Sequence, residues 1–199
     1  MRLGIFGGAF NPVHNGHINL AKSYLSSLAL DKLLIIPTAN PPHRSAVDFA
    51  GEEDRFNMLS LAFHSVDKIE ISDIEFRRSG KSYTYDTVKE LRKTYTNDEI
   101  FLIIGEDQFL NFDSWYRYDE LLKEVVLCTA ARETDTQKAL AEHAQRLLGS
   151  KYGYYIADFE PIVVSSSELR ERLKAGKDVS AYLPADVYNY IKDKGLYIG

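Results

Sequence analysis

Six apolar runs rich in β-prone residues alternate with longer segments of helical periodicity along most of the chain. Several runs, such as KLLIIPT and EVVLCTA, are almost continuously apolar, which is typical of strands buried on both faces of a parallel sheet. Strand alternating with helix predicts a doubly wound α/β sheet. The expected strands are residues 2–6, 32–38, 69–76, 99–105, 124–130 and 154–164.

Helical periodicity fills the intervals between these runs. Ile18, Ala21 and Leu25 fall on one face of a helix, and Leu28 continues that face. Since apolar residues recur at helical spacing in the later intervals too, further helices are expected there. These expected helices are residues 52–65, 84–95, 114–124 and 136–148.

The chain after about residue 166 has a different pattern, because two helical segments follow each other with no strand between them. We therefore expect a small helical appendix at about 166–199, packed on the sheet. The sequence has no repeat, low-complexity tract or Pro/Ser-rich linker. A length of 199 residues then favours a single domain that spans residues 1–199.

Composition narrows the class of protein. Cys128 is the only cysteine, which excludes an internal disulfide and a thiolate metal cage. The formal net charge of -5 argues against nucleic acid as a partner. No apolar run approaches the ~18 residues of a membrane span, and no signal-peptide pattern opens the chain. We expect a soluble, cytoplasmic protein without a membrane partner, and leave a homo-oligomer open.

The stretch GGAFNPVHNGH, residues 7–17, follows the first expected strand, where open α/β sheets bind ligands. Gly7 and Gly8 can adopt positive φ and bring peptide N–H groups close to a ligand. A helix that begins near Gly16 directs its partial positive end to the same place. The stretch therefore predicts a phosphate cradle, although it has neither the dinucleotide nor the Walker spacing.

Two histidines complete this stretch. His14 and His17 are three residues apart, so both rings face the same side if the turn is already helical. A glycine turn with two solvated histidines is one alternative. A zinc site is another, but it needs more ligands than HNGH supplies.

A second stretch, VSSSELRERL, places three serines before an arginine near the C-terminus. Hydroxyls and free N–H groups at the start of a helix, with Arg170 one turn inside, suit the binding of a triphosphate. The alternative is a plain N-cap followed by a helix. The three serines are Ser165, Ser166 and Ser167.

Both stretches resemble signatures of the HxGH nucleotidyltransferase superfamily, namely its N-terminal motif and its serine-rich SSTxIR loop. Four further segments resemble the bacterial nicotinate-nucleotide adenylyltransferases, and the likeness runs from the first expected strand to the last expected helix. These segments are PTANPPHR, SYTYDTVKELR, IIGEDQFLNFDSWYRYDELL and LPADVYNYIKDKGLY.

The resemblance implies a Rossmann-like fold and transfer of AMP from ATP to nicotinate mononucleotide. The attacking phosphate oxygen is already ionised at neutral pH, so the chemistry asks for positioning and charge stabilisation rather than a general base. Mg²⁺ would arrive with the ATP phosphates, without a metal site of the protein's own. The implied catalytic residues are His14, His17 and Arg170.

The resemblance also implies two sets of binding residues. The set for ATP and its phosphates is Gly7, Gly8, Ala9, Phe10, Gly16, Gly105, Asp107, Ser165, Ser166 and Ser167. The set for the pyridine nucleotide is His43, Arg44, Thr84, Trp115, Tyr116 and Arg132. Within it Trp115 would stack on the nicotinate ring, while Thr84 and the backbone at Tyr116 would bind its carboxylate.

Some positions depart from the family pattern. Ala9 and Asn11 stand where threonine and aspartate are usual, and Glu106 where a small or amide residue is frequent. The segment AARET replaces the usual arginine-proline-glycine, which leaves the match of Arg132 open.

Several of these residues also have a purely structural interpretation. Trp115 could be a core residue, Asp107 a helix cap, and the PPHR segment with His43 and Arg44 an exposed loop. Two other functions also stay open: an enzyme that accepts the nicotinamide nucleotide alone or as well, and a nucleotide-binding regulator without turnover.

Overall fold

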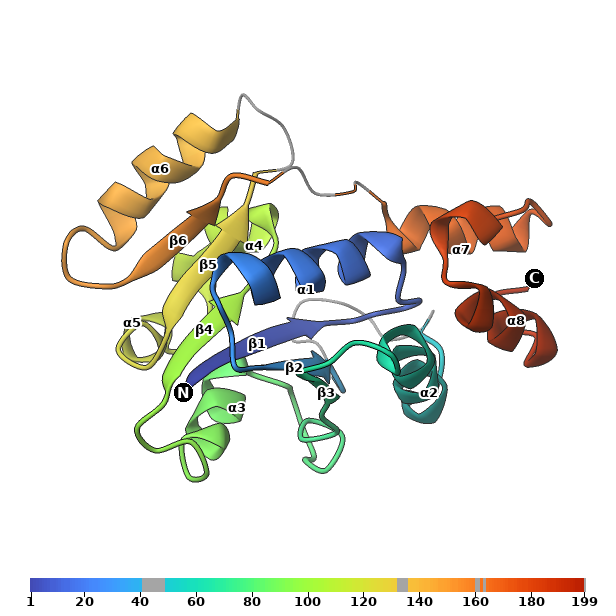
Figure 1. Cartoon of the computed structure of the whole chain (residues 1–199), viewed down its shortest axis with the longest axis horizontal. Coiled ribbons are helices and arrows are strands. Elements are labelled where there is room, and N and C mark those ends of the chain that lie inside the picture. Colours follow the sequence, from blue (N-terminus) through green and yellow to red (C-terminus); the bar gives the residue numbers. More distant parts are fainter. Residues whose placement is uncertain (41–48, 132–135, 160–161, 163, 199) are drawn as a thin grey trace.

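The computed structural model describes residues 1–40, 49–131, 136–159, 162 and 164–198. Its centre is a six-stranded sheet in the order β3-β2-β1-β4-β5-β6, in which all neighbouring strands are parallel (Figure 1). The strands are β1 (Arg2–Gly8), β2 (Lys32–Pro37), β3 (Ile69–Ile71), β4 (Glu99–Ile103), β5 (Val126–Ala130) and β6 (Tyr154–Ala157).

Helices cover both faces of the sheet. One face shares its hydrophobic core with α1 (Asn15–Ser27), α2 (Glu52–Phe63), α7 (Ser166–Lys174) and α8 (Ala185–Asp193). The other shares its core with α3 (Thr84–Leu91), α4 (Glu106–Leu110), α5 (Tyr118–Leu121) and α6 (Thr136–Leu147). Two 3₁₀ turns, η1 (Phe112–Ser114) and η2 (Ser180–Tyr182), complete the described elements.

The continuous apolar runs have the expected physical cause. In β2, Leu33 and Ile35 belong to the core on the α1 side, whereas Leu34 and Ile36 belong to the core on the α3 side. Burial on both faces removes the polar alternation of a half-exposed strand. The prediction of a doubly wound, Rossmann-like sheet, with helices in the C-terminal part of the chain, is confirmed.

Some expected elements were wrong in extent. Among the described residues, the run at 69–76 forms a strand over Ile69–Ile71 and the run at 154–164 forms one over Tyr154–Ala157. Each is an edge strand, with one neighbour to supply hydrogen bonds. The helix expected at 114–124 is replaced by η1 and α5, since Arg117 between them adopts a left-handed φ of 54°. The short helix α4 was not expected.

The strand order creates a switch point beside β1. The chain runs from β1 to β2 and β3 on one side, and then crosses to β4, β5 and β6 on the other. In open α/β sheets a crevice forms where the order reverses, outside the carboxyl ends of the strands. Figure 1 shows α7 beyond the carboxyl end of β1, beside the start of α1, so a C-terminal element also borders this crevice.

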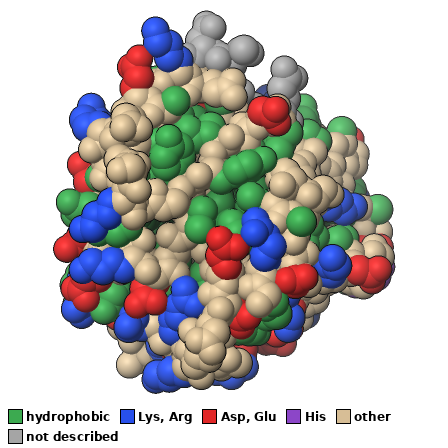
Figure 2. Space-filling view, turned by 60° about the vertical axis from the view of Figure 1, so that its left-hand side comes forward, with side chains coloured by type: hydrophobic (Ala, Val, Ile, Leu, Met, Phe, Trp, Pro, Cys, Tyr) green, Lys and Arg blue, Asp and Glu red, His purple; other side chains and the backbone are tan. Residues whose placement is uncertain are grey.

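The surface shown in Figure 2 has hydrophobic side chains gathered in the middle of the face. Around them, Lys and Arg side chains are interspersed with Asp and Glu rather than collected into one basic patch. Among the helices of the described segments, none combines the length and apolarity needed to cross a membrane.

Candidate functional site

A cleft of about 730 Å³ lies at the carboxyl ends of β1 and β4. It is bordered by the loop after β1, the first turns of α1 and α4, and the start of α7. The cleft thus brings together segments that are more than a hundred residues apart in the sequence. The predicted residues that line it are Gly7, Ala9, Phe10, His14, Gly16, His17, Gly105, Asp107, Ser165, Ser166, Ser167 and Arg170.

His14 and His17 lie against each other at the head of α1. Their rings are stacked, with centroids 3.6 Å apart. His14 is the N-cap of the helix: the N–H of His17 donates to Nδ1 of His14, and the N–H of His14 donates to Nδ1 of His17, both at 3.3 Å. Because each Nδ1 accepts, a neutral ring carries its proton on Nε2. Each neutral imidazole then keeps an Nε2–H as its hydrogen-bond donor.

Burial keeps these two rings neutral. His14 is only 5% exposed, and desolvation lowers its pKa to about 4. Desolvation likewise holds the pKa of His17 well below its ordinary value, with a smaller contribution from His14. In the free protein at neutral pH both histidines are therefore uncharged hydrogen-bond donors rather than cations.

Gly7 and Gly8 do not adopt positive φ, which corrects the expectation for these two residues. Both belong to β1, where they pair with Ile36 and Pro37, and the left-handed residue is Phe10, with φ of 45°. A Cβ at Gly7 would meet nothing within 4 Å, whereas Gly8 is packed against the Phe10 ring and does not line the cleft.

Gly16 is required for a different reason. A Cβ there would come within 2.6 Å of the carbonyl oxygen of Ile162 and 3.1 Å of Nδ1 of His14. Side chains cannot fit at such distances without moving the neighbouring backbone. Gly16 therefore lets the segment before α7 pack directly on the first turn of α1.

Arg170 binds the loop from α7. Its Nη1 donates to the carbonyl oxygen of Asn11 at 2.8 Å, and its Nη2 donates to Oγ of Ser167 at 3.3 Å. Ser166 donates its hydroxyl to the carbonyl oxygen of Pro12 at 3.0 Å. Ser165 is the N-cap of α7, as the alternative interpretation of this stretch proposed. The serines thus build the wall of the cleft as well as facing it.

The acidic residues after β4 also border the cleft. Asp107 is exposed and lies in the first turn of α4, but the N-cap is Gly105, so the capping alternative for Asp107 is wrong. Glu106 is buried, and Thr136 at the start of α6 donates its hydroxyl to Oε2 of Glu106 at 3.0 Å. A carboxylate therefore joins α4 to α6 beside the cleft.

The described residues predicted to bind the pyridine nucleotide lie outside the lining of this cleft. Trp115 is half-buried, with its ring 5.0 Å from that of Phe112, and it packs against the core on the α3 side. Tyr116 is exposed, and its ring lies 4.5 Å from that of Tyr83, next to Thr84 at the start of α3. His43, Arg44 and Arg132 lie outside the described residues.

Arg55 is a structural contributor that the sequence analysis missed. Its side chain is 1% exposed and donates from Nη1 to the carbonyl oxygens of Ala9, at 3.0 Å, and Thr38, at 2.7 Å. It thereby ties the loop after β1 to the end of β2. The sequence does contain an indication that Arg55 is buried. Arg55 precedes Met58 and Leu59 by three and four residues, so it lies on the buried face of α2.

Asn11 was noted in the sequence only as a departure from the family pattern. In the structure it lines the cleft, is 1% exposed, and accepts hydrogen bonds at Oδ1 from the N–H of Ala50 and the hydroxyl of Tyr197. No local pattern could have indicated these partners, because both are distant in sequence.

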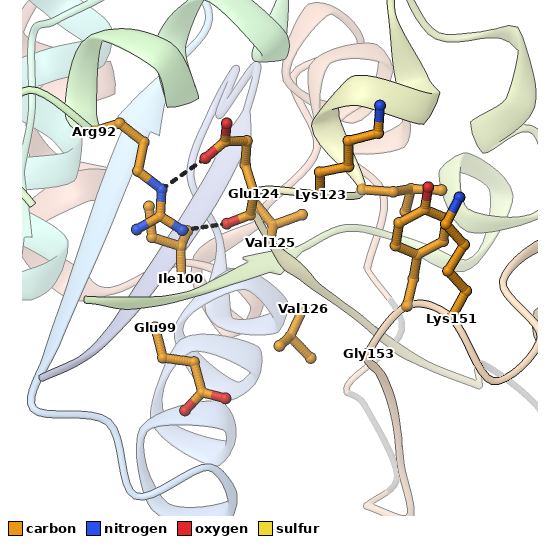
Figure 3. Close-up of a pocket in the computed structure, with 11 residues that line it drawn as sticks. Arg92, Glu99, Ile100, Lys123, Glu124, Val125, Val126, Lys151 and Gly153 are labelled. Atoms are coloured by element: carbon orange, nitrogen blue, oxygen red, sulfur yellow. Dashed lines mark hydrogen bonds and ion pairs between the residues drawn. The ribbon is translucent and has the colours of Figure 1, made fainter. Parts of the chain in front are cut away.

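A second hollow, of about 450 Å³, lies at the opposite end of the sheet. Figure 3 shows Arg92 beside Glu124, and Nε of Arg92 donates to Oε2 of Glu124 at 3.0 Å. The same guanidinium donates to the carbonyl oxygens of Tyr95, Asp98 and Glu124. The guanidinium of Arg92 is therefore engaged in hydrogen bonds that stabilise the neighbouring loops.

In the part of the chain that the structure describes, no three His, Cys, Asp or Glu side chains are grouped so that they could hold an ion. The described neighbours of His14 and His17 thus give no support to the zinc alternative.

Comparisons with known proteins agree with the geometry. The chain matches the cytidylyltransferase-like family over residues 5–172. A protein of Borrelia garinii subsp. bavariensis named a probable nicotinate-nucleotide adenylyltransferase is 41% identical over 198 residues, covering 100% of this chain and 95% of the relative. One of Clostridium tetani with the same name is 36% identical over 194 residues, covering 97% of each.

Solved structures show the same fold at lower identity. The Plasmodium falciparum nicotinic acid mononucleotide adenylyltransferase complexed with NaAD superposes with a TM-score of 0.82 and 20% identity, covering 98% of this chain and 97% of the other. The coverage and identity of the bacterial relatives establish the assignment. The chain belongs to the cytidylyltransferase-like family and, within it, to the nicotinate-nucleotide adenylyltransferases.

Proposed function

We propose that this chain transfers AMP from ATP to nicotinate mononucleotide, giving nicotinate adenine dinucleotide and pyrophosphate in NAD biosynthesis. The observation that carries the proposal is the His14–His17 pair, stacked at the head of α1 in one cleft with Arg170. Adenylyltransferases at 36% and 41% identity over nearly the whole chain support the same reaction.

The proposed mechanism is electrostatic. The phosphate of nicotinate mononucleotide attacks the α-phosphorus of ATP, and pyrophosphate leaves with the electron pair of the broken P–O bond. Negative charge shifts during this step toward the α-phosphate oxygens and the leaving group. The Nε2–H donors of His14 and His17 and the guanidinium of Arg170 stabilise that charge from fixed positions. Because burial keeps both histidines neutral, they need not lose a proton to act.

Magnesium enters the proposal as part of the substrate. Mg²⁺ keeps several waters and is commonly bound through substrate phosphates and one or two carboxylates. Asp107 lies exposed at the border of the cleft, where it could orient the water shell of MgATP or a ribose hydroxyl. This arrangement needs no cage of protein ligands.

The pyridine nucleotide is assigned to the surface around α3 and η1. Thr84 is the first residue of α3, whose N-cap residue Tyr83 makes no side-chain hydrogen bond to the helix. A carboxylate is stabilised at such a helix start. Trp115 and Tyr116 lie next to the 3₁₀ turn η1 and supply aromatic surface for the nicotinate ring. The nicotinamide nucleotide lacks the charge that this site favours.

The experiment measures pyrophosphate release from ATP and Mg²⁺ with three acceptors: nicotinate mononucleotide, nicotinamide mononucleotide and phosphopantetheine. We expect the nicotinate nucleotide to be used fastest. Equal use of the nicotinamide nucleotide would establish the dual-specificity alternative. If ATP binds but no acceptor gives pyrophosphate, the chain is a nucleotide-binding regulator and the proposed reaction is refuted.

A further inference from the structure

Tyr197 lies near the C-terminus, yet its hydroxyl reaches the loop that follows β1. It donates to Oδ1 of Asn11 at 2.6 Å, across a separation of 186 residues. The N–H of Ala50 donates to the same oxygen at 2.9 Å. A buried side chain in the wall of the nucleotide cleft is thus held by the C-terminal segment.

The end of α8 directs the chain to this place. The N–H of Gly195 donates to the carbonyl oxygen of Lys192, and the N–H of Leu196 donates to that of Ile191, at 3.2 and 3.0 Å. These two bonds, with a φ of 61° at Gly195, form a Schellman motif that ends the helix and reverses the chain.

The backbone of Tyr197 is itself left-handed, with φ of 61°. Bulky residues rarely adopt this conformation, and they keep it only where surrounding contacts over-determine it. Burial raises the pKa of Tyr197, with opposing effects of the nearby Arg170 and Arg55, so the hydroxyl keeps its proton at neutral pH. The hydroxyl therefore remains able to donate to Asn11 at neutral pH.

Besides the N–H of Ala50, which shares Oδ1 of Asn11 with Tyr197, other anchors act on the backbone of the loop. Arg170 and Ser166 donate to the carbonyl oxygens of Asn11 and Pro12, whereas Tyr197 holds the Asn11 side chain. Three residues beyond Asn11 lies His14, the N-cap of α1. A shift of Asn11 would be transmitted along this short path to the stacked histidines.

We propose that Tyr197 is a positioning residue for adenylyl transfer, because its bond to Asn11 fixes the loop that carries His14 into the cleft. The proposal rests on the proposed function. Tyr197 does not line the cleft, so its loss should lower kcat while leaving substrate affinity nearly unchanged.

Tyr190 provides a matched control. Its hydroxyl donates to Oδ1 of Asp54 at 2.8 Å and accepts from Nδ2 of Asn57 at 3.1 Å, joining α8 to α2. Tyr197→Phe and Tyr190→Phe both remove one partly buried hydroxyl and keep the ring. We expect Tyr197→Phe to lower kcat about 5- to 30-fold, with both KM values within about twofold, whereas Tyr190→Phe keeps wild-type kcat.

Hydrogen exchange of the peptide that spans residues 9–17 gives a readout independent of turnover. It is measured well below the unfolding midpoint of the weaker variant, so that the folded protein is observed. Faster exchange in Tyr197→Phe than in Tyr190→Phe supports the proposal. The proposal is overturned if the peptide exchanges equally fast in the two variants. It is also overturned if kcat falls in both variants in the same proportion to their loss of stability. If the wild type shows no adenylyl transfer, the proposed function fails while the exchange comparison still tests the contact.

Discussion

The buried histidine His14 should make the protein less stable in mild acid. Burial lowers its pKa from 6.5 to about 4 in the folded state. Between these values the unfolded chain binds a proton that the folded chain does not, so stability falls as the pH falls below 6.5. Applying the linkage relation to this shift gives a loss of about 2 kcal/mol between pH 7 and pH 5 from this group.

The assay is urea unfolding of the wild type and His14→Asn at both pH values. Asparagine does not titrate in this range and is a favourable N-cap residue, so α1 should keep its start. The stability of the variant should fall by about 2 kcal/mol less than that of the wild type over the same interval. His64→Asn, at an exposed histidine outside the cleft, serves as the control and should retain the wild-type dependence. Identical pH dependence of wild type and His14→Asn would refute the reasoning.

Two further substitutions test other parts of the site. Trp115→Ala should raise the KM for the pyridine nucleotide by the equivalent of ~1–3 kcal/mol and leave the KM for ATP unchanged, because stacking is present before and after the transition state. A rise of both KM values in steady-state kinetics, or unfolding of the variant, would instead make Trp115 a core residue. Gly16→Ala places a Cβ 2.6 Å from the carbonyl oxygen of Ile162, so thermal denaturation should show a loss of about 1–3 kcal/mol together with reduced turnover. Wild-type stability and turnover would show that the contact relaxes without cost.

The sheet could be predicted because its signal is local. Continuous apolar runs such as Leu33–Ile36 report burial on both faces, and alternation with helical segments implies parallel order. The same logic overestimated the runs at 69–76 and 154–164, since apolar alternation continues beyond the point where an edge strand loses its partner. Likewise, helical periodicity at 114–124 could not reveal the left-handed backbone of Arg117.

The candidate site was predictable where one motif contains its residues. His14, Gly16 and His17 are adjacent in sequence, so their spacing predicted rings on one side of a turn, and the structure stacks them. Their neutral state depends on burial by distant segments and was not predicted. The bond between Asn11 and Tyr197 is beyond any pattern of spacing, because it joins the two ends of the chain.

The central claim is that the paired histidines stabilise charge during transfer of AMP, and single-turnover kinetics of His17→Ala test it most directly. With enzyme in excess over ATP, formation of nicotinate adenine dinucleotide should slow by ~10²–10³, the scale for loss of one transition-state donor. The Kd for ATP should change little, and His17→Asn, which keeps a donor, should recover part of the rate. A wild-type rate in His17→Ala, or stoichiometric zinc that the variant loses, would contradict the account.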